Sequence, residues 1–597
     1  MRTTHHVRRR RIALVSTVAA FALVVAACSD KKDDSAPDTS SSATTVPGDT
    51  EAPSSSTPDS STPSDGPVVG GRIVVAGEAE AGTPWLPGAV QCDSYCQMRA
   101  RTFYEPIAAV DEDLKVHPYL AESITPNADF TEWTIKLRSG ITFSNGEPLN
   151  ADAAIKNMQV NLNAPLIAVA VKDLARVSAT EFKVEKVDDL TVKMFTGLNG
   201  DPTKPVPWPG FDVYLTGQGA FMAAPSYIDK ALADQSGVEA TKPIGTGPFV
   251  LDSFVPGDRL VVKKNPTYWR KDAAGVQLPY LDEIEFRVIA DANTRQQALE
   301  SGDVDLIATS NANSIADLRD KADKFPMVEQ ADFGETFYVL LNLTVPALQS
   351  RDLRCAMLQA IDKQAIIDLT GGGILKPANG PFSPGQEGYL DDNGSLPYDP
   401  AAAKAGVEAY KAAHNGEAPK VIYSSVPDPD SVTTAQYLQQ VWGDAGIEVE
   451  LKQVEQSTLI GNALFGAPEF NAYGWRNHAG VFVDSQFFWW HSSSAGDPGT
   501  FALNFGRLKD PVIDDLLTKQ RSELDPAKRK QYAEDINRQF AKECWVLPTS
   551  WAIWGVAHNG SIGGIGTLAQ PDGSGKIVRD GAGFPGQVWL TGVWKKG

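Results

Sequence analysis

The densest group of side chains suited to binding chemistry lies between residues 475 and 491. Trp475, Arg476 and Asn477 open this stretch, Asp484 follows, and the aromatic run 487–490 comes near its end. Aromatic walls with a few polar groups are typical of sites for organic ligands, because rigid rings supply contact area and polar groups fix orientation. An arginine can also pair with a carboxylate or phosphate through two parallel hydrogen bonds. The stretch therefore predicts a site for an organic ligand with a polar or anionic group.

The later aromatic residues also fit a second interpretation. Four successive aromatic side chains, Phe487 to Trp490, cannot all face one cleft, so the run is equally compatible with a hydrophobic core. Trp475, Arg476 and Asn477 are the stronger ligand candidates. Asp484 is a further candidate, as the carboxylate in the same stretch.

Two more ligand candidates lie outside this stretch. Trp85 follows a β-like run, residues 72–76, and lies in the loop from Glu78 to Leu86. It contacts a ligand in one interpretation and packs against the loop between Cys92 and Cys96 in the other. Ser424 directly follows the predicted strand 421–423 and is the weaker of the two.

Catalytic and metal-binding motifs are absent from the sequence. It has no H-E-x-x-H, no G-x-S-x-G and no Walker A motif. Ser29 and Lys32 have S-x-x-K spacing, but they lie in a low-complexity segment that cannot form a pocket. His478, Asp484 and His491 match no standard metal-site spacing. We therefore expect a protein that is not an enzyme and that needs no metal or cofactor.

Helical and strand patterns alternate along most of the chain, which predicts an α/β protein. Asp525 and Pro526 form a good N-cap and first turn for a helix ending near Glu543. Residues 433–444 predict a helix that is closed by Gly446 and followed by an alternating strand. The body from residue 67 onward exceeds the size that one hydrophobic core usually supports, so two or more lobes are expected.

The N-terminus predicts an exported, membrane-anchored protein. Arg8 to Arg11 precede the apolar residues 12–27, as in a signal peptide, and Cys28 follows Ala26 and Ala27 directly. This arrangement resembles the lipobox of bacterial lipoproteins, which implies lipid attachment at Cys28 and a stable tether to the cell membrane. An ordinary signal peptide with an incidental cysteine is the alternative. Residues 28–66 are rich in Ser, Thr, Pro and Asp, which predicts a disordered spacer.

Charge and cysteine content restrict the partners and the compartment. The formal charge is −20 and becomes −25 without the leader, because residues 1–27 hold five arginines and no acidic residue. This acidity argues against a nucleic-acid partner. Four cysteines remain after Cys28, and an even number in an exported chain suggests disulfides. The pairs Cys92–Cys96 and Cys355–Cys544 are favoured, although three pairings are possible.

Several short segments of the sequence resemble those of one family. This family is the large substrate-binding proteins of bacterial peptide/nickel-type ABC importers, known as solute-binding protein family 5. The segments occur in the family's order and cover nearly all of the body. The matching segments are Tyr104-Glu-Pro-Ile107, His117-Pro-Tyr-Leu-Ala-Glu-Ser123, residues 137–149, Pro243-Ile-Gly-Thr-Gly-Pro-Phe249, Lys264-Asn-Pro-Thr-Tyr-Trp269, Ser301-Gly-Asp-Val-Asp305, Asn342, residues 351–363 and Gly446-Ile-Glu-Val449.

The resemblance implies a bilobal periplasmic-binding-protein-like fold with an inserted subdomain and a hinge between the lobes. The ligand would lie between the lobes, which close over it, and the loop with Trp85 would line it from the first lobe. The implied organisation is a signal peptide (1–27), a tether (28–66), lobe I (67–98, 241–335 and 559–597), an inserted subdomain (99–240) and lobe II (336–558).

One departure from the family bears on the ligand. Many peptide-binding members carry Trp-x-x-Asp in the second lobe, and its carboxylate pairs with the α-ammonium of the peptide. Here the corresponding run is Gly474-Trp475-Arg476-Asn477-His478, which has no carboxylate at that position. Asp484 lies six residues beyond His478, so its spacing differs from that of the family. This difference argues against a zwitterionic peptide, and the expected ligand is a peptide-like or other polar or anionic solute.

The function expected from the resemblance is capture of a small organic solute outside the membrane and delivery to an ABC permease. We expect a monomer whose partners are the ligand, the permease and the membrane. Peptides, opines, sugars, chelated metals and haem are all bound within this family, so the ligand stays open. A sensor or regulatory scaffold that uses the same fold without a transported ligand is the alternative.

Overall fold

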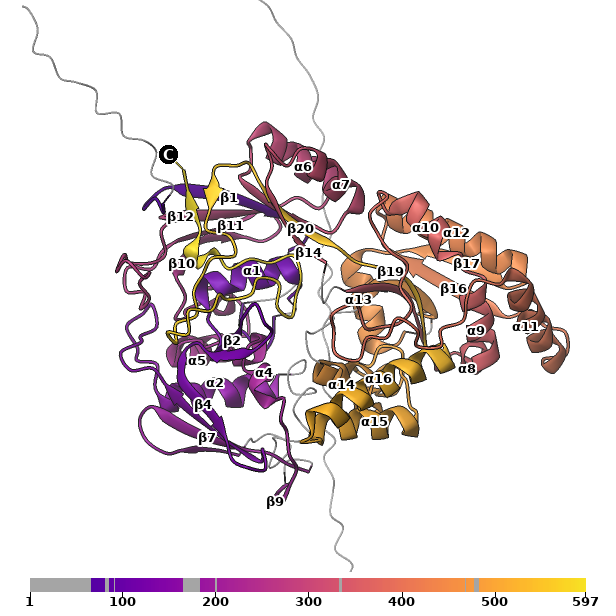
Figure 1. The fold of residues 1–597 in the computed structure, drawn as a ribbon, viewed down its shortest axis with the longest axis horizontal. Helices are drawn as coiled ribbons and strands as arrows, with labels where there is room; N and C mark the ends of the chain where they lie inside the picture. The colour runs from indigo at the N-terminus through magenta and orange to yellow at the C-terminus, as the bar shows by residue number, and fades with distance from the viewer. Residues whose placement is uncertain are drawn as a thin grey trace, which may run out of the picture. The chain divides into compact units, whose positions relative to one another are not determined.

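The computed structural model describes residues 66–80, 85–90, 92–164, 183–198, 201–331, 335–467, 469–476 and 483–596 (Figure 1). The predicted leader, tether and lipid-attachment site at Cys28 lie outside these ranges, as does Asn477. Within them, no helix has the length and apolar character needed to cross a bilayer.

The first lobe is built on a seven-stranded sheet in the order β10-β11-β12-β1-β13-β20-β14. Its central strand β1 runs parallel to both β12 and β13, and all but its first residue are buried, as expected for a strand covered on two faces. Helices α6 and α7 lie beside this sheet in Figure 1 and share a small core with it. The elements are β1 (Arg72–Gly77), β10 (Phe249–Val255), β11 (Arg259–Lys264), β12 (Glu283–Val288), α6 (Ala292–Ser301), β13 (Leu306–Thr309), α7 (Ala312–Asp320), β14 (Met327–Gln330) and β20 (Trp554–His558).

The other side of this lobe carries α1 and the segment predicted as an insertion. A four-stranded sheet in the order β4-β5-β7-β6 and the helices beside it share one large core with α1 and β1. These elements are α1 (Ser94–Phe103), β2 (Ala108–Val110), β3 (Val116–Pro118), β4 (Ala121–Pro126), β5 (Glu132–Leu137), α2 (Ala151–Asn163), β6 (Val184–Lys186), β7 (Thr191–Phe195), β8 (Gly197–Leu198), β9 (Asp201–Pro205), α4 (Phe211–Tyr214) and α5 (Pro225–Ala233).

A buried carboxylate explains why two of the sequence motifs occur together. Glu105 is fully buried and accepts hydrogen bonds from the Tyr268 hydroxyl (2.6 Å) and from Trp269 Nε1 (2.9 Å). Burial raises the pKa of Glu105, and these hydrogen bonds oppose that rise. Gly247 completes the arrangement, because a Cβ there would lie 2.6 Å from the backbone carbonyl oxygen of Thr102. The motifs thus tie the inserted segment to the first sheet.

The second lobe is built on a five-stranded sheet in the order β17-β16-β18-β15-β19. One face packs against α9, α11 and α12, and the other packs against α13 to α16. Figure 1 shows the two groups of helices around this sheet. The elements are β15 (Thr336–Leu341), α8 (Pro346–Gln349), α9 (Arg351–Gln359), α10 (Lys363–Thr370), α11 (Pro400–Ala413), β16 (Lys420–Ser425), α12 (Pro429–Ala445), β17 (Glu448–Gln453), α13 (Gln456–Phe465), β18 (Ala472–Arg476), α14 (Phe487–Trp490), α15 (Pro511–Ser522), α16 (Pro526–Glu543) and β19 (Val546–Trp551).

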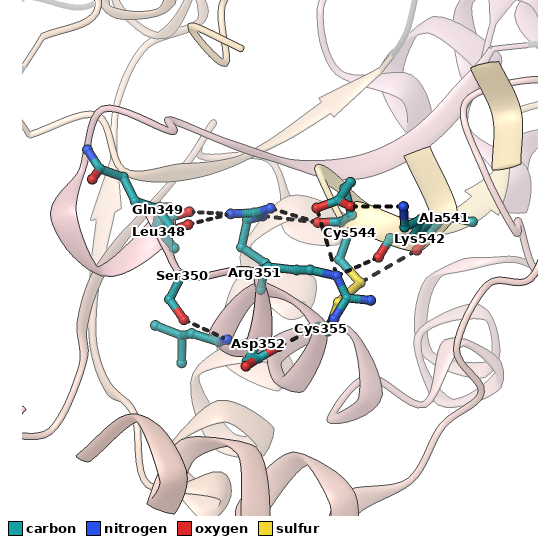
Figure 2. Close-up of a disulfide and its surroundings, with 12 residues drawn as sticks. Leu348, Gln349, Ser350, Arg351, Asp352, Cys355, Ala541, Lys542 and Cys544 are labelled. Carbon is teal, nitrogen blue, oxygen red and sulfur yellow. Dashed lines mark hydrogen bonds and ion pairs between the residues drawn. A yellow bond between two sulfur atoms is a disulfide. The ribbon is translucent and has the colours of Figure 1, made fainter. Parts of the chain in front are cut away.

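Each lobe contains one disulfide. Cys92–Cys96 spans four residues at the start of α1, and Cys355–Cys544 joins residues 189 positions apart. Figure 2 shows the second bond between α9 and the end of α16. Arg354 reinforces the same junction by donating to the backbone carbonyls of Leu348 and Glu543. The disulfide and the arginine therefore hold α9 against the chain that enters β19.

The C-terminal segment returns along the first lobe. Val578 forms a β-bridge with Asp111, and Arg579 N donates to the Val110 carbonyl (2.8 Å). His117 on β3 lies between two carboxylates, with Nε2 2.8 Å from Asp111 and Nδ1 2.6 Å from Asp572. The segment is thus attached to the β2–β3 hairpin by both backbone and charged contacts.

The strand β20 refines the predicted lobe limits. It pairs with β13 and β14 of the first sheet, although residues 336–558 were assigned to the second lobe. The chain passes from β19 to β20 through Ala552 and Ile553. We propose that this crossing marks the end of the second lobe, so that the second lobe comprises residues 336–551.

Candidate ligand-binding site

The two sheets meet at edges that commonly bind ligands. In open α/β sheets, ligands bind beyond the carboxyl ends of the parallel strands. Glu78 directly follows β1, Ser310 and Asn311 follow β13, and Asp430 lies in the first turn of α12 after β16. Asn311 Nδ2 donates to Asp430 Oδ2 at 3.0 Å. The carboxyl edge of the first sheet therefore contacts that of the second.

Arg476 is the centre of this contact. It ends β18, and its guanidinium lies 2.6 Å from Glu335 Oε2 and 3.5 Å from Glu78 Oε1. Its Nη1 donates to Ser310 Oγ at 2.9 Å, and its Cζ lies 4.7 Å from the ring centroid of Trp554. Glu78, Ser310 and Trp554 belong to the first lobe. We call Arg476 with these partners and Glu335 the Arg476 node.

Nearby carboxylates keep the Arg476 side chain positively charged. Burial alone would lower the pKa of Arg476, but the carboxylates of Glu335 and Glu78 outweigh that effect and raise it. The Glu335 side chain is 1% exposed, whereas that of Glu78 is 27% exposed. Glu335 is therefore the closer and more deeply buried of the two carboxylate partners, and Glu78 is the more exposed one.

The first lobe has more charged groups besides Glu78. Asp93 caps α1 by accepting from Cys96 N (2.8 Å), and burial, aided by Glu78, raises its pKa. Arg99 pairs with Glu80 at 2.6 Å. Sequence reasoning missed Glu78, Asp93, Ser310 and Glu335. For Glu78 the available signal was its position two residues after the predicted run 72–76, at the start of the loop that holds Trp85.

Trp475 lies where an aromatic wall was predicted. Its ring makes edge-to-face contacts with Tyr473 (5.4 Å between centroids) and Phe505 (5.2 Å). It also borders a hollow of about 10 Å³, which has room for little more than one water. The hollow is lined by Tyr338, Leu340, Trp475, Trp489, Trp490, Leu503 and Phe505. In this arrangement Trp475 presents an apolar surface and no room for a whole ligand.

The later aromatic residues pack inside the second lobe. Phe487 and Trp490 are buried, and Trp490 contacts Phe540 edge-to-face at 4.8 Å. Phe488 and Trp489 are half-buried against the same core. Phe487 and Trp490 therefore belong to the hydrophobic core, as the second interpretation of this run predicted.

Asp484 has partners from both lobes. Arg521 Nε donates to its Oδ1 at 2.6 Å, and Trp208 Nε1 of the first lobe donates to its Oδ2 at 3.1 Å. The Arg521 guanidinium lies 3.8 Å from the ring centroid of Phe487 and 5.2 Å from that of Trp208. Both carboxylate oxygens thus bind the chain itself. We call Asp484, Arg521 and Trp208 the Asp484 node.

Trp85 and Ser424 are buried in this structure. Trp85 is 0% exposed and contacts Phe103 and Phe254 edge-to-face, at 5.1 and 5.6 Å between centroids. Its Nε1 has no hydrogen-bond partner among the described residues. Ser424 lies in β16, opposite Tyr473 and Lys452. Neither is placed at the Arg476 node, and Asn477 lies outside the described residues.

No group of three or more potential metal ligands occurs within the ranges that the structure covers. Of the residues considered for a metal, His478 falls outside those ranges. His491 stacks on Phe487 at 4.3 Å, and Asp484 is held by Arg521 and Trp208. These contacts are those of packing and ion pairing.

Comparison with known proteins identifies the family. The family described as bacterial extracellular solute-binding proteins, family 5 Middle, matches residues 115–499. A glutathione-binding protein, GsiB, from Escherichia coli K12 is 28% identical over 455 residues, which are 74% of this chain and 83% of that protein. GsiB from Pectobacterium atrosepticum is 29% identical over 365 residues, 61% of this chain and 66% of that protein.

Solved structures share the fold. The binding protein AgaA from A. tumefaciens R10, in complex with agropinic acid, has a TM-score of 0.71 at 23% identity and covers 83% of this chain and 94% of its own. A dipeptide-binding protein from Pseudoalteromonas sp. SM9913, in complex with Met-Leu, has a TM-score of 0.72 at 18% identity and covers 88% and 100%. These similarities confirm the predicted bilobal α/β fold class.

The family match covers more than half of the chain. The members of this family are solute-binding proteins rather than enzymes, as predicted. The chain belongs to the bacterial extracellular solute-binding proteins of family 5.

Proposed function

We propose that this protein captures a small organic solute between its two lobes and delivers it to an ABC permease while anchored to the membrane through Cys28. The observation that supports this proposal is the Arg476 node, in which one arginine of the second lobe contacts Glu78 and Ser310 of the first. Such contacts are those of a closed binding protein. Relatives are named for binding glutathione, and fold neighbours were solved with agropinic acid, Met-Leu or Ni(L-His).

The closing motion follows from where the chain crosses between lobes. One crossing lies between Gln330 of β14 and Thr336 of β15, and the other between Trp551 of β19 and Trp554 of β20. Glu335 stands at the first crossing and accepts from Trp554 Nε1 at 3.0 Å across the second. Glu335 therefore links the two crossings, which would form the hinge, to Arg476. Contacts between the lobes that involve neither crossing, such as that of Asn311 with Asp430, would part on opening.

The ligand chemistry follows from the unequal partners of Arg476. A ligand carboxylate or phosphate captured between the lobes as they close would compete with Glu78 for Arg476, because this carboxylate is the more exposed and more distant of the two. Arg476 would then contribute a charge-assisted hydrogen bond to the ligand. Ligand contacts that exist only in the closed form shift the equilibrium toward it, and the permease would recognise that form.

The first experiment is native mass spectrometry of the full chain, purified in detergent from an exporting host. A discrete extra mass that is lost on denaturation supports solute capture and identifies the ligand class. A ligand-free mass, followed by a solute screen that leaves both the thermal midpoint and the lobe separation unchanged, contradicts capture and favours the scaffold interpretation.

The role of Arg476 needs a variant that keeps the charge balance. Arg476→Ala alone would remove the positive charge that lies 2.6 Å from the buried Glu335 carboxylate, which is strongly destabilising. The double variant Arg476→Gln/Glu335→Gln removes both charges with similar shapes. We expect it to fold and to bind an anionic ligand at least about tenfold more weakly, measured by calorimetry. Unchanged affinity would remove Arg476 from the ligand site.

The anchor is tested separately. Cys28→Ala should move the protein from the membrane fraction to the medium or periplasm, because the acyl chains supply the membrane affinity. Retention of the variant in the membrane fraction would contradict lipid attachment at Cys28.

A further inference from the structure

The contact between Trp208 and Asp484 joins the lobes away from the strand edges that form the Arg476 node. Trp208 is 1% exposed and lies in the first lobe between β9 and α4, where it packs against Phe211 at 5.4 Å. Its Nε1 donates to Asp484 Oδ2 of the second lobe at 3.1 Å. The acceptor precedes α14, and Arg521, its other partner, lies on α15.

The charges of this node belong to one lobe. Asp484 and Arg521 are both in the second lobe, 2.6 Å apart, and the Arg521 side chain is 4% exposed. The carboxylate is thus held in place whether or not Trp208 is present. The first lobe contributes a neutral N–H and an aromatic ring that lies 5.2 Å from the guanidinium. Separating the lobes here would break one hydrogen bond and a ring contact without separating opposite charges.

We propose that Trp208, Asp484 and Arg521 form a closure latch, which stabilises the closed form without touching the ligand. Asp484 is then a positioning residue rather than the replacement for the carboxylate that this chain lacks in its Trp-x-x-Asp position. This inference rests on the proposed function only in that the lobes open and close.

The latch would act on the rate of ligand release. A contact made in the closed form and lost in the open form raises the closed fraction, whichever solute is bound. The apparent affinity changes by the same factor as the fraction of the binding-competent form. A hydrogen bond to a carboxylate has enough strength to change the ratio of closed to open molecules by about tenfold.

Two variants weaken the latch by different means, and each has a matched control. Trp208→Phe removes the N–H donor and keeps an aromatic ring. Trp442→Phe is its control, because Trp442 is 0% exposed and donates to Met357 O at 3.1 Å within the second lobe.

The second variant wedges the interface apart. A Cβ on Gly210 would lie 3.6 Å from Asp484 Cβ, so Gly210→Leu places the rest of its side chain against the carboxylate. Gly210 has an ordinary φ of −89°. Gly217 has a φ of −102° and nothing within 4 Å of its Cβ position, so Gly217→Leu is the control in the same part of the lobe.

The measurement is the distance distribution between two nitroxide labels on the ligand-free full chain in detergent, recorded by pulsed electron paramagnetic resonance. The labels replace Lys263 on β11 and Lys420 on β16, whose side chains are 52% and 77% exposed. We expect Trp208→Phe and Gly210→Leu to lower the closed-to-open ratio by about tenfold, with the control variants unchanged. For any solute found to bind, the same two variants should release it faster with little change in association rate.

Two results would overturn the latch: distance distributions that none of the variants changes, or equal changes in the latch variants and their controls. If the lobe distances respond to the latch variants while no solute binds or changes them, the latch stands and the proposed solute capture fails. The two proposals are therefore tested independently.

Discussion

The Arg476 node and the Asp484 node use the same three kinds of side chain in opposite ways. Each combines an arginine, a carboxylate and a tryptophan. At the Arg476 node the arginine comes from one lobe and a partner carboxylate, Glu78, from the other, so opening separates opposite charges. At the Asp484 node the ion pair lies within one lobe and only Trp208 comes from the other. This difference is the basis for proposing ligand exchange at the first node and a closure latch at the second.

The largest expected effect comes from Glu335, the buried carboxylate of the Arg476 node. Glu335→Gln should lower the free energy of unfolding by about 3 kcal/mol, because it leaves Arg476 without its buried partner. Chemical denaturation measures the change. Glu122→Gln is the control, since Glu122 pairs with Lys136 at 52% exposure and should contribute almost nothing. Equal losses in both variants would contradict the special role of Glu335.

A smaller effect is expected at the Asp484 node. Arg521→Lys keeps the charge but cannot reproduce the planar guanidinium that donates to Asp484 and stacks on Phe487. We expect a loss of about 1–2 kcal/mol in unfolding free energy together with a more open lobe distribution. A stability loss without any change in lobe distance would mean that the ion pair is structural and that Trp208 does not depend on it.

Glu78→Gln should affect stability least and ligand binding most selectively. Its side chain is partly exposed and 3.5 Å from Arg476, so the change in unfolding free energy should stay below about 1 kcal/mol. An anionic ligand should bind more tightly to this variant, because its competitor for Arg476 is neutral. Calorimetry with the solute found by mass spectrometry measures this. Weaker binding would show that Glu78 contacts the ligand directly.

Two groups outside both nodes should contribute to the pH dependence of stability. His117 lies between Asp111 and Asp572, and although burial lowers its pKa, these carboxylates raise it above the ordinary 6.5. Its contribution is then complete below about pH 6.5 and is lost as pH rises through the folded-state pKa. Burial raises the pKa of Asp580 from its ordinary 3.8 to about 7. Its contribution to the free energy of unfolding is therefore lost as pH rises from about 3.8 to about 7. Above that range, of these two groups, only His117 still loses its contribution as pH rises, whereas Lys363, whose pKa burial lowers to about 8, gains stability above about pH 8.

His117→Asn tests this assignment. The wild-type thermal midpoint should fall as pH rises from 7 to 8, below the range in which Lys363 adds stability, and the variant should show a flatter profile over the same range. The lobe distance distribution should be the same in both proteins. A decline that persists unchanged in His117→Asn would place the responsible group elsewhere.

The sequence predicted much of the fold because local patterns dominated it. The alternating strands, the Asp525-Pro526 start of α16 and the Gly446 end of α12 are all present. The order of the strands could not be read locally, since β20 joins the first sheet only through its pairing with β13 and β14. This is why the predicted second lobe extended seven residues beyond β19 (from 551 to 558).

The site was harder to predict than the fold. Arg476 was identified from its chemistry, but its partners Glu78, Ser310 and Glu335 are distant in sequence and come together only through the contact of two lobes. Asp484 stood out as a carboxylate near the predicted site, yet its oxygens are used by Arg521 and Trp208. Trp85, a ligand candidate by position, is buried among Phe103 and Phe254. Residue type predicted polarity and size, whereas burial and pairing depend on tertiary contacts.

The way the two sheets share the chain has a consequence for biogenesis. The second sheet is complete within residues 336–551, whereas the first needs β1 near the N-terminus and β20 near the C-terminus. During export from the N-terminus, β1 emerges first but β20, which lies between β13 and β14, emerges almost last. We expect the second lobe to reach its native state first, since contacts between distant segments form slowly. Protease protection of residues 336–551 in a chain truncated before β20, without protection of β1, would show this order. The first lobe, although its strand β1 lies near the N-terminus, would then be the last to mature, and synthesis of β20 would be the step that completes the folded protein.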